Sequence, residues 1–241
     1  VEGAIFTRAP KDKKNTAIFV GGSNMAAGQA LFEAVKRHYF GGFRVSVMLD
    51  SNGCNTTAAA AVAKLTASGT LSGKKAVVLA GTGPVGQRAA CMLANEGAKV
   101  TITSRKLANA VAACQAMQDR FGVQLTPLEA VDMPARANAI ADANIVLATG
   151  AAGVELLAEE HWCNNPHLEL IADANATPPL GIGGTDMMDK GLDRHGKIIW
   201  GAIGFGTLKL ALHRACIAKL FESNDQVFDA ENIFALAKEM A

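Results

Sequence analysis

Residues 77–86, with the sequence VVLAGTGPVG, decide the fold of this chain. An apolar run typical of a strand buried on both faces leads directly into the pattern GxGxxG at Gly81, Gly83 and Gly86. The first glycine of such a turn permits the tight bend, the second lets a pyrophosphate approach the backbone, and the third lets the following helix pack against the strand. The unpaired N–H groups at the start of that helix attract the phosphates. The stretch therefore predicts a dinucleotide site in an α/β domain.

From residue 74 onward, strands and helices alternate regularly. Strands are expected over residues 75–80, 99–104, 123–126, 144–149, 168–173 and 198–202, and helices over residues 84–96, 107–120 and 134–143. Strands joined by helices in this way form a parallel sheet with right-handed crossovers. The fold class predicted for this part is a Rossmann-type parallel sheet of the α/β class.

The two ends of the chain carry further elements. Strands are expected over residues 16–20 and 44–49, and helices over residues 25–39, 55–66, 207–221 and 229–240. Small polar residues at 67–73 (ASGTLSG) predict a loop and a domain boundary. The glycine cluster at residues 201–206 (GAIGFG) is expected to be a loop immediately before the helix that carries Lys209. Within this loop, Gly204 is expected to let a flat ring approach the backbone.

The residues after the second strand of the Rossmann series indicate which dinucleotide binds. An NAD site expects Asp or Glu there, to accept hydrogen bonds from the ribose hydroxyls. The chain has Ser104, Arg105 and Lys106 instead, and cationic groups attract a 2′-phosphate. NADP is therefore the predicted cofactor, with a solvated basic turn as the alternative explanation. The predicted cofactor-binding residues are Gly81, Thr82, Gly83, Pro84, Val85, Gly86, Ser104, Arg105, Lys106, Thr149, Gly150, Ala151, Asn175 and Gly204.

The composition of the chain argues against several classes of protein. Its 241 residues carry a net charge of +1 and 5% are aromatic, which disfavours a nucleic-acid-binding protein. The apolar runs are too short to span a bilayer, so no membrane partner is expected. The five cysteines contain no CxxC pair and the five histidines no HxxxH spacing, so neither disulfides nor a metal site is predicted. Because the start of the chain lacks the pattern of a signal peptide, we expect a cytoplasmic protein.

Five runs of the sequence resemble one protein family. They are FVGGSNMAAG (19–28), MLDSNGCNTTAAA (48–60), VVLAGTGPVG (77–86), DANATPPLGIGG (173–184) and GAIGFGTLKLALHRACIAKLFES (201–223). The chain resembles the NADP-dependent methylene-tetrahydromethanopterin dehydrogenases of methylotrophic bacteria, whose related members also accept methylene-tetrahydrofolate. The resemblance covers nearly the whole chain. It implies an oxidoreductase of one-carbon metabolism that transfers a hydride from the methylene form of a tetrahydropterin carrier to NADP, giving the methenyl form and NADPH.

The resemblance also implies an organisation in two domains. Residues 70–206 would form an NADP-binding Rossmann domain, and residues 1–69 with 207–241 a smaller α/β domain for the pterin. Family members carry a further N-terminal segment, about one βαβ unit in size, ahead of the position of Val1, so we expect the pterin domain to lack that segment here. The resemblance further implies a homo-oligomer, a trimer or hexamer.

Lys209 is the catalytic residue that the resemblance implies, because it matches the family position at the pterin. We expect it to donate a hydrogen bond to a pterin carbonyl or to lie uncharged. Asp50, Asn52 and Asn55 are expected either to contact the amide edge of the pterin or to cap the helix that follows them. Asp173 is expected to offset the positive charge of the product.

Two other functions stay open at this point. One is a folate-specific methylene dehydrogenase that also carries cyclohydrolase activity, which would require a base to activate water; no paired acid and base is evident in the sequence. The other is a non-enzymatic NADP-sensing module. Such a module would lack a second pocket, and the glycine cluster at 201–206 with Lys209 downstream argues against it.

Overall fold

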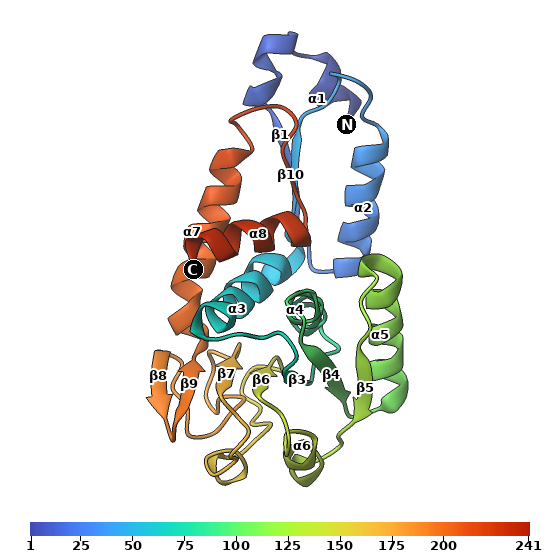
Figure 1. Ribbon diagram of the computed structural model, residues 1–241. Coiled ribbons are helices and arrows are strands. Elements are labelled where there is room, and N and C mark those ends of the chain that lie inside the picture. The colour runs from blue at the N-terminus through green and yellow to red at the C-terminus, as the bar shows by residue number, and fades with distance from the viewer.

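The structure is a computed structural model that describes residues 1–241 (Figure 1). Its larger sheet has seven strands in the order β5-β4-β3-β6-β7-β9-β8. Their bounds are β3 (Lys75–Leu79), β4 (Lys99–Ser104), β5 (Thr126–Glu129), β6 (Ile145–Ala148), β7 (Leu170–Asp173), β8 (Lys190–Arg194) and β9 (Lys197–Trp200). All neighbours pair in parallel except β8, which is antiparallel to β9. This is the predicted Rossmann-type α/β sheet, and its strand order reverses between β3 and β6.

Helices cover both faces of this sheet because its strands are apolar on both sides. The bounds are α3 (Cys54–Ser68), α4 (Pro84–Asn95), α5 (Leu107–Phe121), α6 (Met133–Ala139), α7 (Ala202–Lys219) and α8 (Ala230–Met240). Val78 of β3 faces the core that contains α3, α4, α7 and α8, whereas Val77 and Leu79 face the core that contains Ile140 and Trp162. Figure 1 shows α3, α4 and α8 on one side of the strands and α6 on the other.

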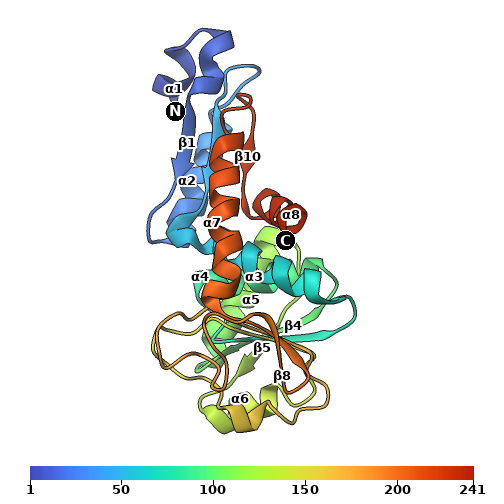
Figure 2. The ribbon, with the colours of Figure 1, turned by 90° about the vertical axis from the view of Figure 1, so that its left-hand side faces the viewer.

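A smaller parallel sheet lies beyond these helices and joins the two ends of the chain. It has the order β1-β2-β10, with β1 (Ala17–Val20), β2 (Ser46–Leu49) and β10 (Val227–Phe228). Helix α2 (Met25–Arg37) packs on it through the buried Phe32 and Val35. Four short helices complete the chain: α1 (Glu2–Phe6), η1 (Pro10–Asn15), η2 (Ser51–Gly53) and η3 (Glu159–His161). Helix α7 runs from the larger sheet to the smaller one (Figure 2).

A single apolar core of 34 buried residues connects the two sheets. It reaches from Met48 of β2 through residues 58–63 and Leu65 of α3 to Leu147 of β6. Residues 58–61 of α3 are all alanine and fully buried. Because α3 is enclosed by α4, α7 and α8 and by the strands, only short side chains fit along its centre.

The predicted secondary structure differs from the observed one in several places. The strand expected over 123–126 is observed as β5 at 126–129, because Val123 packs under α5 against Cys91 and Met117 and not in the sheet. The strands β8 and β10 were not predicted. Asp229 is the N-cap of α8 and accepts a hydrogen bond from the backbone N–H of Asn232, as expected.

A further difference concerns the glycine cluster at 201–206, which was expected to be a loop. That prediction is wrong, because α7 already begins at Ala202 and Lys209 lies two turns into the helix. Gly204 is a packing residue: a Cβ at this position would lie 1.8 Å from the carbonyl oxygen of Asp189, at the start of β8. The close approach that glycine permits here is therefore between α7 and the neighbouring backbone, not between the backbone and a ligand.

Four of the cysteines, Cys54, Cys91, Cys114 and Cys216, are buried, as expected for small apolar residues. Burial raises the pKa of Cys91 and of Cys216 to about 12, so both remain thiols at neutral pH. None of the helices has the length and apolar character needed to cross a membrane.

The packing of α7 on β8 predicts opposite effects for two glycines in the same helix. Gly204→Ala should lower the free energy of unfolding by at least ~1–3 kcal/mol, because the new Cβ collides with backbone. Gly206→Ala, where a Cβ meets nothing within 4 Å, should raise it by up to about 1 kcal/mol. Urea denaturation of both variants measures the difference. Similar midpoints for the two variants would contradict this account of α7.

Candidate functional site

The glycine turn after β3 has the shape that a dinucleotide requires. A Cβ on Gly86 would lie 2.6 Å from the Cα of Gly81 and 2.6 Å from Oγ1 of Thr149, so α4 can approach β3 only with glycine here. A Cβ on Gly81 would lie 2.9 Å from a methyl carbon of Val78. Gly83 differs from both, because a Cβ there would meet nothing within 4 Å. The turn is therefore tightly packed underneath and open above Gly83, where phosphates would lie.

The start of α4 supplies donors to the same space. Gly83 is the N-cap of α4 and no side chain caps the helix. Pro84 at the first position has no N–H, and the next N–H groups have no acceptor within the helix. Unpaired N–H groups and the positive end of the helix dipole together form an anion site. The residues present thus fit a pyrophosphate.

The turn lies at the point where the strand order reverses. Thr149, at the end of β6, donates a hydrogen bond from Oγ1 to the carbonyl oxygen of Leu79 at 3.2 Å, and this bond joins the ends of β6 and β3. The structure therefore brings the turn at 81–86 together with the predicted stretch Thr149, Gly150 and Ala151. Open α/β sheets bind ligands in the crevice at such a reversal, outside the carboxyl ends of the strands.

The basic turn after β4 is exposed and free of ion pairs. Oγ of the buried Ser104 accepts a hydrogen bond from the backbone N–H of Lys106 at 3.3 Å. The side chains of Arg105 and Lys106 are exposed, and neither forms a hydrogen bond or an ion pair. The turn thus presents two cations without ion-pair partners at the edge where the ribose of a dinucleotide would lie.

A third cation, Arg136 of α6, lies beside this turn and was not identified from the sequence. Ser104 pairs with Glu129 in the sheet, and Ala130 N–H donates to the Ser104 carbonyl at 2.8 Å, so the chain that leads into α6 follows the end of β4. Burial lowers the pKa of Arg136, the charge of Asp132 opposes this shift, and the charge of Arg105 adds to it. The Nε of Arg136 is buried and has no hydrogen-bond partner. Neighbouring guanidinium groups of this kind favour a phosphate between them.

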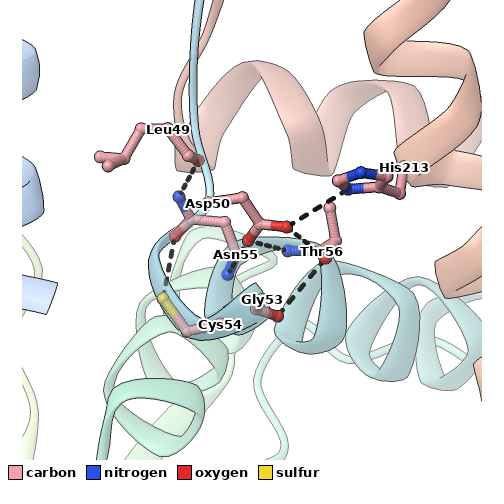
Figure 3. A network of polar contacts seen from close by, with 7 residues as sticks. All are labelled: Leu49, Asp50, Gly53, Cys54, Asn55, Thr56 and His213. Carbon is pink, nitrogen blue, oxygen red and sulfur yellow. Dashed lines mark hydrogen bonds and ion pairs between the residues drawn. The ribbon is translucent and has the colours of Figure 1, made fainter. Parts of the chain in front are cut away.

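A second group of polar residues follows β2 and is shown in Figure 3. Asp50 is only 4% exposed, and its Oδ1 accepts hydrogen bonds from the backbone N–H groups of Asn55 at 3.0 Å and Thr56 at 3.2 Å. Its Oδ2 accepts a hydrogen bond from the Thr56 hydroxyl at 2.7 Å and lies 3.6 Å from Nδ1 of His213 in α7. Asp50 therefore caps α3, one of the two roles expected for it.

Asn55 is also occupied by its own surroundings. It is fully buried, and its Nδ2 donates to the carbonyl oxygen of Leu49 at 2.6 Å. A contact between a substrate and either Asp50 or Asn55 remains a prediction.

Lys209 and Asn52 are the members of the expected substrate set that remain free. The Nζ of Lys209 lies 3.6 Å from the position of a Cβ on Gly53, and it forms no hydrogen bond or ion pair. Asn52 is exposed, and its backbone is left-handed with φ of 53°. His213 lies one turn after Lys209 on α7, and its place in this group was not predicted because α3 and α7 are distant in sequence.

Asp173 and Asn175, after β7, form a separate group. The two oxygens of Asp173 accept hydrogen bonds from the backbone N–H groups of Asn175 and Ile182, each at 2.9 Å. Burial raises the pKa of Asp173, and these hydrogen bonds oppose the shift. The Nδ2 of Asn175 donates to the carbonyl oxygen of Pro179 at 3.2 Å. No hydrogen bond or ion pair joins Asp173 to Asp50 or Lys209, so their joint action on one substrate stays a prediction.

The chain is similar to known proteins over its full length. A family model described as methylene-tetrahydromethanopterin dehydrogenase, N-terminal, matches residues 1–52. The bifunctional protein MdtA of Methylorubrum extorquens AM1 is 58% identical over 243 residues, which cover 100% of this chain and 84% of that protein. The NAD(P)-dependent methylenetetrahydromethanopterin dehydrogenase of the same organism is 32% identical over 250 residues, with the same coverage.

Solved structures share the fold at low sequence identity. A transhydrogenase from Sinorhizobium meliloti has a TM-score of 0.52 and 17% identity, and the match covers 78% of this chain and 55% of that one. Quinate dehydrogenase from Corynebacterium glutamicum, solved in complex with NAD, has a TM-score of 0.51 and 12% identity, with 91% and 97% coverage.

The different surroundings of Gly83 and Gly86 give a test of the dinucleotide cradle. Gly86→Ala should weaken both folding and dinucleotide binding, because its Cβ forces α4 away from β3. Gly83→Ala should leave the free energy of unfolding nearly unchanged but weaken binding, because its methyl group enters the open space above the turn. Urea denaturation and titration with NADP separate the two effects. Unchanged NADP affinity in Gly83→Ala would place the phosphates elsewhere.

Proposed function

The chain belongs to the methylene-tetrahydromethanopterin dehydrogenase family, and from that premise we propose that it oxidises methylene-tetrahydromethanopterin to the methenyl form with NADP. The observation that carries the proposal is the cradle of Gly81, Gly83 and Gly86 at the reversal of the strand order, which fits a nicotinamide dinucleotide. Methylene-tetrahydrofolate, which shares the reacting pterin, is the second substrate of the same class.

The reaction removes a hydride from the methylene carbon that bridges two nitrogens of the carrier. When bound, NADP supplies the acceptor for this hydride. The carrier becomes a methenyl cation whose charge is shared by the two flanking nitrogens. Because no proton leaves the substrate, the protein needs no general base. This agrees with the oxygens of Asp50, which are taken up by the amides and hydroxyl at the start of α3.

The task left to the protein is to hold two ring systems in contact and to limit water. The start of α4 binds the phosphates, and Lys209 with Asn52 offers donors to the carbonyl edge of a pterin. Correct placement of reacting groups contributes up to about 7–11 kcal/mol of barrier reduction. Limited access of water protects the methenyl cation from hydrolysis.

We propose the domain division that the resemblance implies, with residues 1–69 and 207–241 as the pterin domain and residues 70–206 as the NADP domain. The presence of two separate sheets supports it. The start of α7 at Ala202 supports a second boundary a few residues earlier than the sequence predicts. The chain would then pass from one domain to the other after α3 and before α7. The homo-oligomeric state and the cytoplasmic location remain predictions.

The direct test is to mix the protein with NADP and methylene-tetrahydromethanopterin and to measure the reduction of NADP by the absorbance of the reduced nicotinamide. In parallel reactions, methylene-tetrahydrofolate replaces the methanopterin carrier, or NAD replaces NADP. The variant Gly86→Ala, in which the cofactor site is disrupted, is the negative control. Turnover with NADP supports the proposal. NADP binding without turnover of either carrier would instead support the sensing module.

The basic side chains of Arg105, after β4, and Arg136, in α6, predict how NADP is distinguished from NAD. Arg105→Ala and Arg136→Ala should each lower kcat/KM for NADP about 10- to 100-fold, because each removes a charge-assisted hydrogen bond to the 2′-phosphate. With NAD, kcat/KM should hardly change. Lys99→Ala, at the opposite end of β4, is the matched control and should alter neither value. A parallel loss with NAD and NADP would assign these arginines to folding or to another part of the cofactor.

The proposed contact of Lys209 with the pterin predicts how its removal affects turnover of the one-carbon carrier. Lys209→Ala should lower kcat/KM for methylene-tetrahydromethanopterin about 10- to 100-fold, because a charged donor to the pterin is lost. The affinity for NADP alone should not change. Arg214→Ala, an exposed cation on the same helix without an ion pair, is the control. If Lys209→Ala retains wild-type kinetics, the amine has no role at the carrier.

A further inference from the structure

Phe19 is a large, exposed aromatic residue in contact with His213. Its neighbour Val20 in β1 is buried, whereas the side chain of Phe19 is 48% exposed. Three other exposed phenylalanines, Phe6, Phe40 and Phe43, contact one another. Phe19 is not part of that cluster, and its aromatic partner is His213.

The backbone and His213 hold the ring of Phe19 in place. The two rings meet edge to face, with centroids 5.9 Å apart and an interplanar angle of 75°. A Cβ on Gly21 would lie 2.9 Å from Cε1 of Phe19, so the backbone after β1 turns close to this ring. An exposed aromatic side chain fixed in this way offers a flat face at little cost in conformational entropy.

His213 is in turn oriented from below by Asp50. Nδ1 of His213 is buried, has no hydrogen-bond partner and lies 3.6 Å from Oδ2 of Asp50 (Figure 3). The neighbouring carboxylate favours a proton on Nδ1 and leaves Nε2 as the acceptor of the neutral ring. Asp50 is itself fixed by its hydrogen bonds to the start of α3. The side chain of His213 remains 37% exposed, so the imidazole is available to a ligand.

We propose that Phe19 and His213 form the binding face for the flat ring of the one-carbon carrier, with Asp50 as the residue that positions His213. This inference rests on the proposed function and adds specificity-determining contacts to it. A reduced pterin has a planar amide ring whose edge alternates N–H donors with a carbonyl acceptor. Lys209 offers only donors, and Nε2 of His213 offers an acceptor one helical turn away, about 5–6 Å between Cβ atoms. The two side chains together complement that edge, while the ring of Phe19 stacks on its face.

In this proposal Asp50 is buried because it positions His213 without contacting the carrier, whereas Phe19 and His213 are exposed because they contact the carrier. A carboxylate in direct contact with a carrier would hold its cationic product by charge attraction. Here the carboxylate of Asp50 is withdrawn to 4% exposure, and the imidazole stands between it and solvent. The carrier is thus recognised by stacking and hydrogen bonds, which the methylene and methenyl forms share.

Steady-state kinetics with methylene-tetrahydromethanopterin tests the proposal on the full chain. Phe19→Leu should raise the carrier KM about 3- to 10-fold, because stacking is lost while an apolar side chain remains. Phe19→Tyr should restore KM to within about twofold, since the aromatic face is retained. Phe43→Leu, another exposed phenylalanine near the small sheet, is the matched control and should leave KM unchanged. The Kd for NADP should be the same in all these variants.

Asp50→Asn tests the positioning step, because asparagine also caps helices well and its single oxygen can still accept the two backbone N–H groups at the start of α3. Its amide would donate to Nδ1 and shift the proton of His213 to Nε2. The ring-nitrogen chemical shifts of His213 should report this change of tautomer, and the carrier KM should rise with an unchanged Kd for NADP. A merely structural role for Asp50 would leave the tautomer unchanged.

The outcomes separate this inference from the proposed function. If the wild-type protein oxidises the carrier and Phe19→Leu leaves its KM unchanged, the binding face is wrong and the dehydrogenase activity stands. An equal rise in KM for Phe19→Leu and Phe19→Tyr would also overturn the stacking contact. If the wild-type protein oxidises neither carrier, both the function and the binding face are wrong.

Discussion

The close packing around α3 is the constraint on which the rest of the structure depends. This helix lies between the two sheets, and its residues 58–61 are alanines with no exposed surface. Alanine at these positions lets α4, α7 and α8 approach the helix from different sides, which larger side chains would prevent. The same helix begins at the polar group around Asp50, while α4, packed beside it, begins at the glycine turn. The packing of one alanine-rich helix thus fixes both candidate sites.

Two glycines allow helices to pack closely on neighbouring backbone, but the starts of these two helices differ. Gly86 allows α4 to contact the end of β3 and leaves the N-terminus of the helix free for phosphates. Gly204 allows α7 to contact the backbone at Asp189 and has no open space beside it. Both belong to glycine-rich stretches that look alike in sequence. What distinguishes the two helix starts is that the N–H groups of Ile203 and Gly204 donate to the carbonyl oxygen of Met187, whereas the first N–H groups of α4 have no such partner.

The parts of the fold that were predictable are those that depend on local sequence. The pattern around Gly81 to Gly86, the strand–helix alternation and the cap at Asp229 each involve residues within about one helical turn of one another. The residues that were missed depend on the strand order. Arg136 meets the basic turn only because β5 lies next to β4, and His213 meets Asp50 only because α7 returns to the smaller sheet. Neither contact has a signal in a single sequence.

The two carboxylates assigned to the substrate from sequence, Asp50 and Asp173, share a property that bears on the chemistry. Both are almost completely buried, and both accept backbone N–H groups on their oxygens. Oxygens that already accept such bonds have fewer lone pairs left for a water molecule or a substrate proton. An enzyme that hydrolysed the methenyl product would need a free base beside its water, whereas hydride transfer needs none. The way this chain uses its buried acids therefore suits a reaction in which the only species to leave the carrier is a hydride.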